Sequence, residues 1–600
     1  MFTICLLVLS IGACSRLHND NHSNISKNDE NTKLTKKPLA LAMKAYELIV
    51  GNTDSKAMVI YNLERAYLAN GVTQTVINRL LKKQEKAKTE DEKDDELDTF
   101  ARSALDEKKP DFNKALTFAR SIKNPETKSK ILLYIAKDMP KNNRLFILRE
   151  ADKLIATSKI NKIVYERRSK LLKLGKMYFE SGDKQSARKT ILASHDLLIR
   201  NTSSSNAVDF GTVAELESKL DIQPSNLCKL TRFLHKTKDR PIALAKITAA
   251  YLTNGYQGQV CMPEKELIAE VQKMPNAASR VQEQIVLAEA WHARKEKNKS
   301  LRLYNDAIKS AKLVSSQDYQ LDMMSKILIS LRKTANKTLY NSFRGAYWKQ
   351  VDSRSSYMQS STLMQLSLEA YDVEGLTDLS FEGLSKMKES SLKATSGVTL
   401  ARIAHKKNDL AFEKQVLDEA FLAAKTAPHP DPKIFWLREV IDTADELGHK
   451  NISEQALKVI TGAIEKVPDL EMKIMYATLT SRKAWEHKDY HLAQKLLQQS
   501  QLWYEQWIKK LRDTNKDNNS GTDYYEVNKN NTLIDLLENN VLLGNNSTAI
   551  VLLNRLPSKN IQAKALVYAA IALAEKRKKF GVSKTDKSMM EILEKKISGH

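Results

Sequence analysis

The stretch that decides the fold is LLKLGKMYFESGDKQSARKTILAS, residues 171–194. Its first half places a Leu-Gly pair three residues before a tyrosine, a Gly-Asp turn follows, and its second half spaces Ala and Ile four residues apart. Small residues let two antiparallel helices approach closely, and large side chains fill the space between them. The stretch therefore predicts a helical hairpin. Its pattern is carried by Leu174, Gly175, Tyr178, Gly182, Ala187 and Ile191.

Weaker copies of this hairpin recur along the chain. AYLANG at 66–71 and AYLTNG at 250–255 both end in a glycine, which favours the left-handed backbone that closes many helices. The order of leucine, small residue, aromatic residue, turn and second helix returns at 287–308 and at 400–421, and 481–497 keeps Ala484, Asp489 and Ala493 of the same pattern. The copies indicate a repeat protein.

The spacing of the turns gives a second signal. The intervals are 111, 73, 40, 113, 40 and 40 residues, close to three, two, one, three, one and one units of 37–40 residues. Such a period is typical of a solenoid of stacked hairpins. The turns are at Gly71, Gly182, Gly255, Lys295, Asn408, Gly448 and Lys488.

The hairpin at 171–194 resembles the tetratricopeptide repeat, which puts Leu-Gly and Tyr on its first helix and Ala on its second. The resemblance implies an all-α fold, a right-handed α/α superhelix of about fourteen hairpins between Pro38 and the C-terminus. The period exceeds the 34 residues of the strict repeat, so HEAT-like stacking is an alternative.

Composition agrees with a helical fold. The 600 residues include 18 Gly and 13 Pro, which is few for a chain of this length, and 42% are apolar, enough for a large core. We expect N-terminal repeats over 38–200, central repeats over 212–511 and a C-terminal set with a cap over 534–600. Polar segments suggest a joint at 202–211 and an exposed loop at 512–533.

The N-terminus predicts export. The apolar run from Phe2 to Ile11 is about half the length needed to cross a bilayer. Ile11-Gly12-Ala13-Cys14 resembles a bacterial lipobox, which implies that residues 1–13 are a signal peptide and that Cys14 is acylated, with palmitate-type chains. Ordinary secretion with cleavage and an uncleaved N-terminus are the alternatives.

Two features follow from the lipobox resemblance. Ser15, directly after the cysteine, implies sorting to the outer membrane, with the body of the protein in the periplasm or at the cell surface. Residues 14–37 are nearly devoid of apolar side chains, so they cannot bury enough surface to fold and we expect a disordered tether.

The net charge of +24 has two interpretations. In an exported protein it favours contact with anionic lipid headgroups, anionic glycans or an acidic partner protein. The alternative is that lysine-rich helices are simply solvated. Because the protein is expected outside the cytoplasm, nucleic acid is not an expected partner.

Two cysteines remain in the mature chain, Cys228 and Cys261. An even number of cysteines in an exported domain favours a disulfide. Two buried free thiols are the alternative. The absence of a CxxC motif gives no support to a redox or zinc site.

The chain shows no motif for catalysis or cofactor binding. It has no glycine-rich phosphate loop, nucleophile elbow or HExxH, so we predict no catalytic residue, metal or cofactor. His487 and His491 have helical spacing, but Asp489 falls at a predicted turn that separates them. Trp503 and Trp507 share a helix face, where they form either a partner-contact platform or part of the core.

The sequence thus leads to one main hypothesis. The protein is a non-enzymatic, lipid-anchored periplasmic solenoid whose concave face binds a protein or peptide partner in cell-envelope assembly or secretion. By resemblance, tetratricopeptide lipoproteins of the outer membrane assist the assembly of envelope structures. The alternative is an envelope enzyme that processes peptidoglycan or polysaccharide on a superhelical body.

Overall fold

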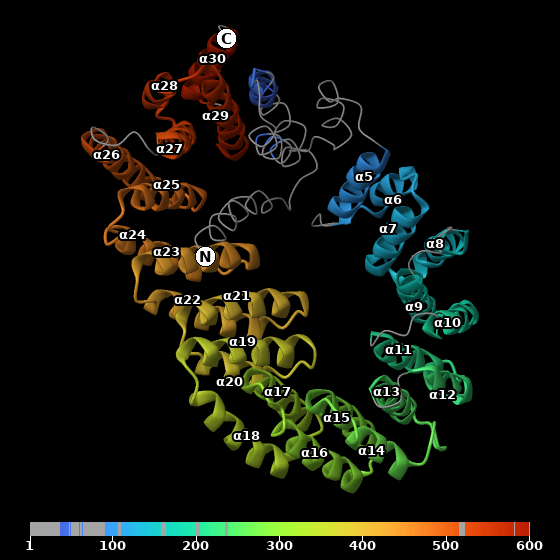
Figure 1. Cartoon of the computed structure of the whole chain (residues 1–600). Coiled ribbons are helices and arrows are strands. Elements are labelled where there is room, and N and C mark those ends of the chain that lie inside the picture. Colours follow the sequence, from blue (N-terminus) through green and yellow to red (C-terminus); the bar gives the residue numbers. More distant parts are fainter. Residues whose placement is uncertain are drawn as a thin grey trace. The chain divides into compact units, whose positions relative to one another are not determined.

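A computed structural model describes most of the chain beyond its N-terminal region. The described residues are 37–46, 48, 49, 59, 63, 66, 90–105, 110–157, 164–199, 205–234, 238–514, 522–580 and 583–598. Within these ranges every regular element is a helix (Figure 1). The expected signal peptide at 1–13, Cys14, nearly all of the expected tether and Gly71 lie outside them.

The chain divides into two compact units, Glu85–Gly383 and a unit made of Met1–Gln84 with Leu384–His600. The sequence does not predict this division, which falls within α20. The helices of the first unit are α5 (Glu90–Leu105), α6 (Phe112–Ser121), α7 (Pro125–Asp138), η3 (Lys141–Asn143), α8 (Leu145–Thr157), α9 (Val164–Glu180), α10 (Lys184–Ile199), α11 (Ser205–Lys219), α12 (Ser225–Leu230), η4 (Thr231–Phe233), α13 (Asp239–Thr253), α14 (Glu264–Gln272), α15 (Ala277–Ala293), α16 (Lys297–Ala311), α17 (Gln317–Lys333), α18 (Lys337–Asp352), α19 (Ser356–Asp372) and α20 (Thr377–Lys386).

The second unit is called the C-terminal unit below, after its larger part. Its labelled helices are α21 (Ser390–Lys406), α22 (Leu410–Thr426), α23 (Pro430–Leu447), α24 (Lys450–Ile464), α25 (Leu470–Glu486), α26 (Tyr490–Thr514), α27 (Thr522–Leu543), α28 (Asn546–Asn554), α29 (Lys559–Phe580) and α30 (Lys584–Ser598).

Consecutive helices pack as hairpins within each unit. Pairs such as α9 with α10, α15 with α16, and α21 with α22 make extensive contact. Odd-numbered helices also pack on the next odd-numbered helix, for example α11 on α13 and α27 on α29 (Figure 1). Each hairpin therefore buries its apolar faces against its neighbours, and the predicted all-α solenoid is confirmed.

The predicted turn residues that lie within the described ranges have left-handed backbones. The amide of the following residue bonds back to the helix end, as Asp489 N does to Ala484 O at 2.9 Å and His449 N to Ala444 O at 2.7 Å. This is the hydrogen bond of a Schellman cap, and it needs a positive φ at the turn residue. The φ values are 85° at Gly182, 89° at Gly255, 65° at Lys295, 58° at Asn408, 86° at Gly448 and 66° at Lys488.

Further left-handed residues fill the longer intervals. Asp221 divides the gap of 73 residues into two repeats, and Ala335 and Gly375 divide the gap of 113 residues into three. The two shortest repeats have short second helices, α12 with 6 residues and α20 with 10 residues. The sequence hides Asp221 and Ala335 because neither is a glycine and because no aromatic residue precedes them as Trp291 precedes Lys295 and Trp485 precedes Lys488.

Burial repeats with the same period. In α22 and α24, each buried residue of 411–430 has a buried counterpart in 451–470, and the exposed positions also correspond. Phe412 corresponds to Ile452 and Leu417 to Leu457, for example. Stacked hairpins require this equivalence, because each one presents the same faces to its neighbours.

Two expected irregular segments are largely helical. α26 continues to Thr514 and α27 begins at Thr522, so the predicted loop at 512–533 is wrong over most of its length. Two asparagines of α27 find partners on other helices: Asn528 donates a hydrogen bond to Glu471 of α25 at 2.9 Å, and Asn531 accepts one from Lys564 of α29 at 3.3 Å. The expected joint at 202–211 is likewise helical from Ser205 onward.

Close helix contact explains the small residues of the hairpins. An added Cβ at Gly175 would lie 2.6 Å from Cδ1 of Ile191. Leu174, Tyr178 and Ala187 are also buried in the core of this unit. The pattern that defines the hairpin is therefore a packing requirement between α9 and α10.

Gly397 offers a direct test of this requirement. On α21, an added Cβ would lie 2.7 Å from Val416 O and 2.8 Å from Ala420 Cβ on α22. We expect Gly397→Ala to lower the free energy of unfolding by about 1–3 kcal/mol, because neither neighbour is the flexible end of a side chain. Urea titration followed by circular dichroism measures the change.

Gly462 on α24 is the matched control, because no atom of a neighbouring helix lies within 4 Å of its added Cβ. Gly462→Ala should raise the free energy of unfolding by up to about 1 kcal/mol through helix propensity alone. Changes of the same sign in both variants would contradict the close-packing explanation.

Candidate binding surface

Charged side chains connect the odd-numbered helices of the C-terminal unit. Arg402 of α21 lies 3.0 Å from Glu446 of α23, measured from Nε to Oε2. Arg402, Asp442 and Arg482 occupy equivalent positions, each six residues before the left-handed turn residue of its repeat. We call this set of residues the charged ladder. It consists of Arg402, Asp442, Asp445, Glu446, Arg482, Lys483, Glu486, Glu538 and Glu575.

Arg482 joins three helices. Its guanidinium contacts Glu538 of α27, lies 2.8 Å from Glu575 of α29, and lies 3.7 Å from Glu486 on its own helix. A planar group with five donors suits several carboxylates at once. Burial raises the pKa of Glu575, and the charge of Arg482 opposes that shift. Arg482 therefore links α25, α27 and α29 at one point.

Lys483 and Asp445 join α23 to α25. The buried Lys483 ammonium lies 2.9 Å from both Asp442 and Asp445. Asp445 also accepts hydrogen bonds from Ser453 at 2.6 Å and from His487 at 3.1 Å. Burial alone would raise the pKa of Asp445, but the bond with His487 and the charge of Lys483 lower it to about 2. The carboxylate is therefore stabilised in its charged form.

A buried acid occupies a position that is small in neighbouring repeats. Glu413 on α22 corresponds to Ser453 on α24, yet it is a carboxylate with 1% of its surface exposed. It accepts hydrogen bonds from Nδ1 of His405 at 2.9 Å and Nε2 of His449 at 2.6 Å. These contacts join α21, α22 and the start of α24. Alignment of the repeats could have revealed this site from the sequence, because it places the charged Glu413 opposite the small Ser453.

An exposed aromatic pair lies beside the ladder. Tyr490 and Phe580 are 41% and 46% exposed, and their rings pack edge to face with centroids 5.7 Å apart. Phe580 also packs against Trp485, whose ring lies 4.3 Å from the ammonium of Lys579. The pair comes from the start of α26 and the end of α29, so the sequence alone does not bring the two residues together.

Trp503 and Trp507 lie in the core. Each is 6% exposed; Lys473 lies 4.9 Å above the ring of Trp503, and the ring of Tyr504 lies 6.1 Å from that of Trp507. The expectation that they contact a partner is wrong, because this face of α26 packs inward. The alternative, that they form part of the core, describes them correctly.

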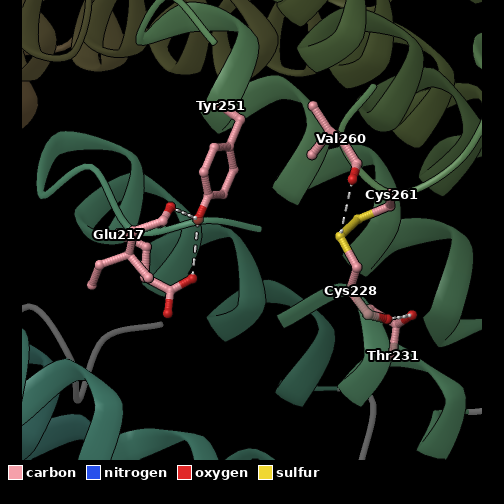
Figure 2. Close-up of a disulfide and its surroundings, with 7 residues drawn as sticks. Glu217, Cys228, Thr231, Tyr251, Val260 and Cys261 are labelled. Carbon is pink, nitrogen blue, oxygen red and sulfur yellow. Dashed lines mark hydrogen bonds between the residues drawn. A yellow bond between two sulfur atoms is a disulfide. The ribbon is translucent and has the colours of Figure 1, made fainter. Parts of the chain in front are cut away.

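A disulfide joins Cys228 and Cys261 (Figure 2). Their sulfurs are 1.97 Å apart and their Cα atoms 5.3 Å apart. Cys228 is on the six-residue helix α12, and Cys261 lies in the segment between α13 and α14. Closing a loop of this length contributes roughly 3–4 kcal/mol in the chain-entropy account. The bond stabilises a repeat whose second helix is too short to contribute much packing.

A buried polar cluster lies beside this disulfide. Figure 2 shows the Tyr251 side chain directed toward Glu217. The Tyr251 hydroxyl lies 3.2 Å from Glu217 and 2.8 Å from the carbonyl oxygen of Ile222, and burial raises the pKa of Tyr251. His195 contacts the other oxygen of Glu217 at 2.7 Å. The cluster connects α10, α11 and α13.

The two histidines singled out in the sequence lie on different helices. His487 ends α25, whereas His491 lies within α26, and Asp489 between them caps that helix by accepting from Leu492 N at 3.0 Å. In the part of the chain that the structure describes, no group of three or more His, Cys, Asp or Glu side chains is arranged to hold a metal ion. Within the same part, none of the helices combines the length and apolarity that a membrane span requires.

Comparison with known proteins gives no family. No family model matches the chain, and no curated protein matches it. Ton1535 from Thermococcus onnurineus NA1 aligns with 13% identity over 56% of this chain and 97% of that chain, with a TM-score of 0.20. The APC/C hetero-tetramer Cut9–Hcn1 aligns with 10% identity over 92% and 98%, with a TM-score of 0.19.

A circular tandem repeat protein aligns with 12% identity over 95% of this chain and 98% of that chain, with a TM-score of 0.13. TM-scores this low carry no argument about function. The description of the solenoid therefore depends on the helices and turns of the chain itself.

The Asp445 contacts predict a pH dependence. A folded pKa of about 2 against an ordinary value of 3.8 stabilises the fold above about pH 4, and this contribution is lost as the pH falls toward 2. Asp445→Asn should lower the free energy of unfolding by about 2 kcal/mol at pH 7 and reduce the loss of stability between pH 4 and 2. Urea titrations at several pH values measure both effects.

Asp418 on the exposed face of α22 is the control for this experiment. Asp418→Asn should change the free energy of unfolding by less than about 0.5 kcal/mol. If both variants behave alike, the contacts of Asp445 do not contribute to stability as described.

Proposed function

We propose that this protein is a lipid-anchored helical-repeat scaffold of the bacterial cell envelope, and that it binds a protein partner in envelope assembly or secretion. The charged ladder is the observation that carries the proposed partner class. It crosses successive odd-numbered helices and carries both signs of charge, with Arg402 and Glu446 as its exposed members.

The ladder favours a protein over a nucleic acid. A groove for nucleic acid needs cations that are free to replace the counterions of phosphates. Here Arg402, Lys483 and Arg482 all face carboxylates on neighbouring helices. A surface of mixed sign complements another protein surface, and cross-helix ion pairs hold it in one geometry before binding.

The exposed aromatic pair supplies an anchor of the kind that partners use. Large aromatic side chains contribute much of the binding energy at protein interfaces. Tyr490 and Phe580 are exposed and already packed against each other, so they lose little side-chain freedom on binding. We therefore place the partner contact across this pair and the adjacent ladder.

Two observations support the envelope location. The lipobox resemblance at Cys14 and the polar segment behind it describe an anchor followed by a spacer. The Cys228–Cys261 disulfide suits an oxidising compartment. In such a compartment, a net charge of +24 also favours contact with anionic lipids or glycans at the outer membrane.

The alternative of an envelope enzyme has no specific support. General acid–base chemistry needs carboxylates that exchange protons with a substrate. In the charged ladder, Arg482 binds Glu538 and Glu575, and Lys483 binds Asp442 and Asp445. We therefore keep the scaffold as the proposed function.

Replacing Cys14 tests the anchor. Cys14→Ser should abolish incorporation of a radioactive fatty acid and move the protein from the membrane fraction to the supernatant, because the acylated thiol is lost. Cys5→Ser, within the removed signal, is the control and should keep both label and membrane association. Unchanged labelling of the Cys14 variant would refute the lipid anchor.

Site-specific crosslinking in intact cells tests the partner surface. A photoreactive phenylalanine analogue in place of Phe580 should give one discrete protein adduct, identified by mass spectrometry. The same analogue in place of Lys458, exposed on α24, should not give that adduct. The partner surface is wrong if the Phe580 position forms no adduct or if both positions give the same one.

A further inference from the structure

A neutral cavity lies within the C-terminal unit and is lined by residues of α26, the end of α27, the α27–α28 turn, the first turn of α28, and α30. Its volume is about 500 Å³. None of the described residues that line it carries a charge, although 28% of the chain is charged. Primary amides dominate its wall, and we call it the amide cavity. The amides that matter below are Gln494, Gln498, Gln501, Asn540 and Asn545.

The two preceding repeats of the C-terminal unit carry charge at the corresponding positions. On α22, the positions equivalent to Gln494 and Gln498 are the exposed Lys414 and Asp418. On α24 they are the exposed Glu454 and Lys458, with the charges reversed. At these two positions α22 and α24 therefore carry charged side chains, whereas α26 carries amides. Solvation alone does not require this change.

Part of the amide wall is held in place by the protein. Asn545 donates its side-chain hydrogens to Gln494 at 3.1 Å and to Asn540 at 3.2 Å. Asn540 in turn donates to the carbonyl oxygen of Leu536 at 2.7 Å. Asn545 precedes α28 but makes no capping hydrogen bond to it, because its amide is directed to these neighbours. The network fixes the position of Gln494.

The remaining glutamines are available to a ligand. Among the described residues, the side chains of Gln498 and Gln501 have no protein hydrogen-bond partner. Each primary amide offers a carbonyl acceptor and two N–H donors without net charge. The cavity therefore presents donors and acceptors together. An anion would use only the donors and a cation only the acceptors, whereas a peptide group uses both.

The spacing of the amides suits an extended peptide. Helical rise places Gln494, Gln498 and Gln501 about 6 Å and about 4.5 Å apart along α26. Peptide groups on one side of an extended chain repeat about every 7 Å, which side chains with three rotatable bonds can match. The first turn of α28 (Asn546–Asn554) adds backbone N–H groups that favour carbonyl oxygens.

We propose that the amide cavity binds an extended, uncharged segment of a partner polypeptide, mainly through the backbone of that segment. A charged segment would lose hydration without gaining an opposite charge. A neutral glycan is less suited, because no aromatic ring among the described lining residues offers a stacking face. This site is separate from the ladder and independent of the lipid anchor, so it goes beyond the proposed function.

Binding of the purified full chain to a peptide array tests the proposal. The probes are ten-residue peptides of Gly, Ala, Ser, Thr, Asn and Gln with blocked ends. We expect a subset to bind, with affinity changing less than about twofold between 50 and 300 mM NaCl, because no ion pair is involved. N-methylation of alternate backbone nitrogens in the bound peptides should weaken binding about tenfold or more.

Variants place the binding in the cavity. The Gln498→Ala/Gln501→Ala double variant should weaken peptide binding about tenfold or more. The Glu454→Ala/Lys458→Ala double variant, at exposed positions on α24, should leave it unchanged. If the first variant fails to fold by circular dichroism, Gln498→Glu replaces it and should weaken binding similarly by burying an uncompensated charge.

Several results would overturn the proposal. They are the absence of any bound peptide, binding that survives both cavity variants, and binding that N-methylation does not weaken. A neutral glycan array that binds the chain and loses binding in the cavity variants, with no peptide bound, would assign the site to glycans instead.

Discussion

Each hairpin from α9–α10 to α27–α28 depends on a backbone constraint at the end of its first helix. A residue with positive φ lets the next amide return to the helix end, and the following helix then starts in a fixed direction. Because most repeats between Gly182 and Lys488 keep 40 residues between these points, equivalent side chains recur at equivalent places. Arg402, Asp442 and Arg482 can form one ladder for this reason.

The ladder shows how a solenoid uses residues that its packing does not need. Apolar positions are almost fixed by the contact between neighbouring hairpins, as the matched burial of α22 and α24 shows. Positions outside this apolar contact can vary, and here they carry charge that neighbouring helices neutralise. Glu413 goes further, since it places a carboxylate within the core and satisfies it with two histidines. Such buried groups cost stability unless every contact is made.

Local sequence patterns predicted much of the fold. The turn at Gly182 and the small residue at Gly175 act through neighbours in the same hairpin, and both could be predicted from the residues around them. Ala335 escaped prediction because an alanine has no preference for a left-handed backbone, which the surrounding packing imposes. The asparagines near 530 suggested a loop, but Asn528 and Asn531 find partners on other helices.

The candidate sites were harder to predict because their residues are distant in the chain. Arg482 meets carboxylates that are 56 and 93 residues away, and no local pattern specifies those meetings. Trp503 and Trp507 show the opposite error: their spacing correctly placed them on one helix face, but spacing cannot say whether a face is covered. The amides of the cavity had no motif at all, and only the comparison with α22 and α24 makes them unusual.

The disulfide has a mechanical consequence. If the two ends of the chain are pulled apart, the residues between Cys228 and Cys261 cannot extend, because the covalent bond bypasses them. A separation of 33 residues corresponds to roughly 110 Å of extended chain that is removed from the reach of the force. Under tension, the repeat with the shortest second helix is therefore the one that keeps its chain length, while its neighbours can still unravel and lengthen.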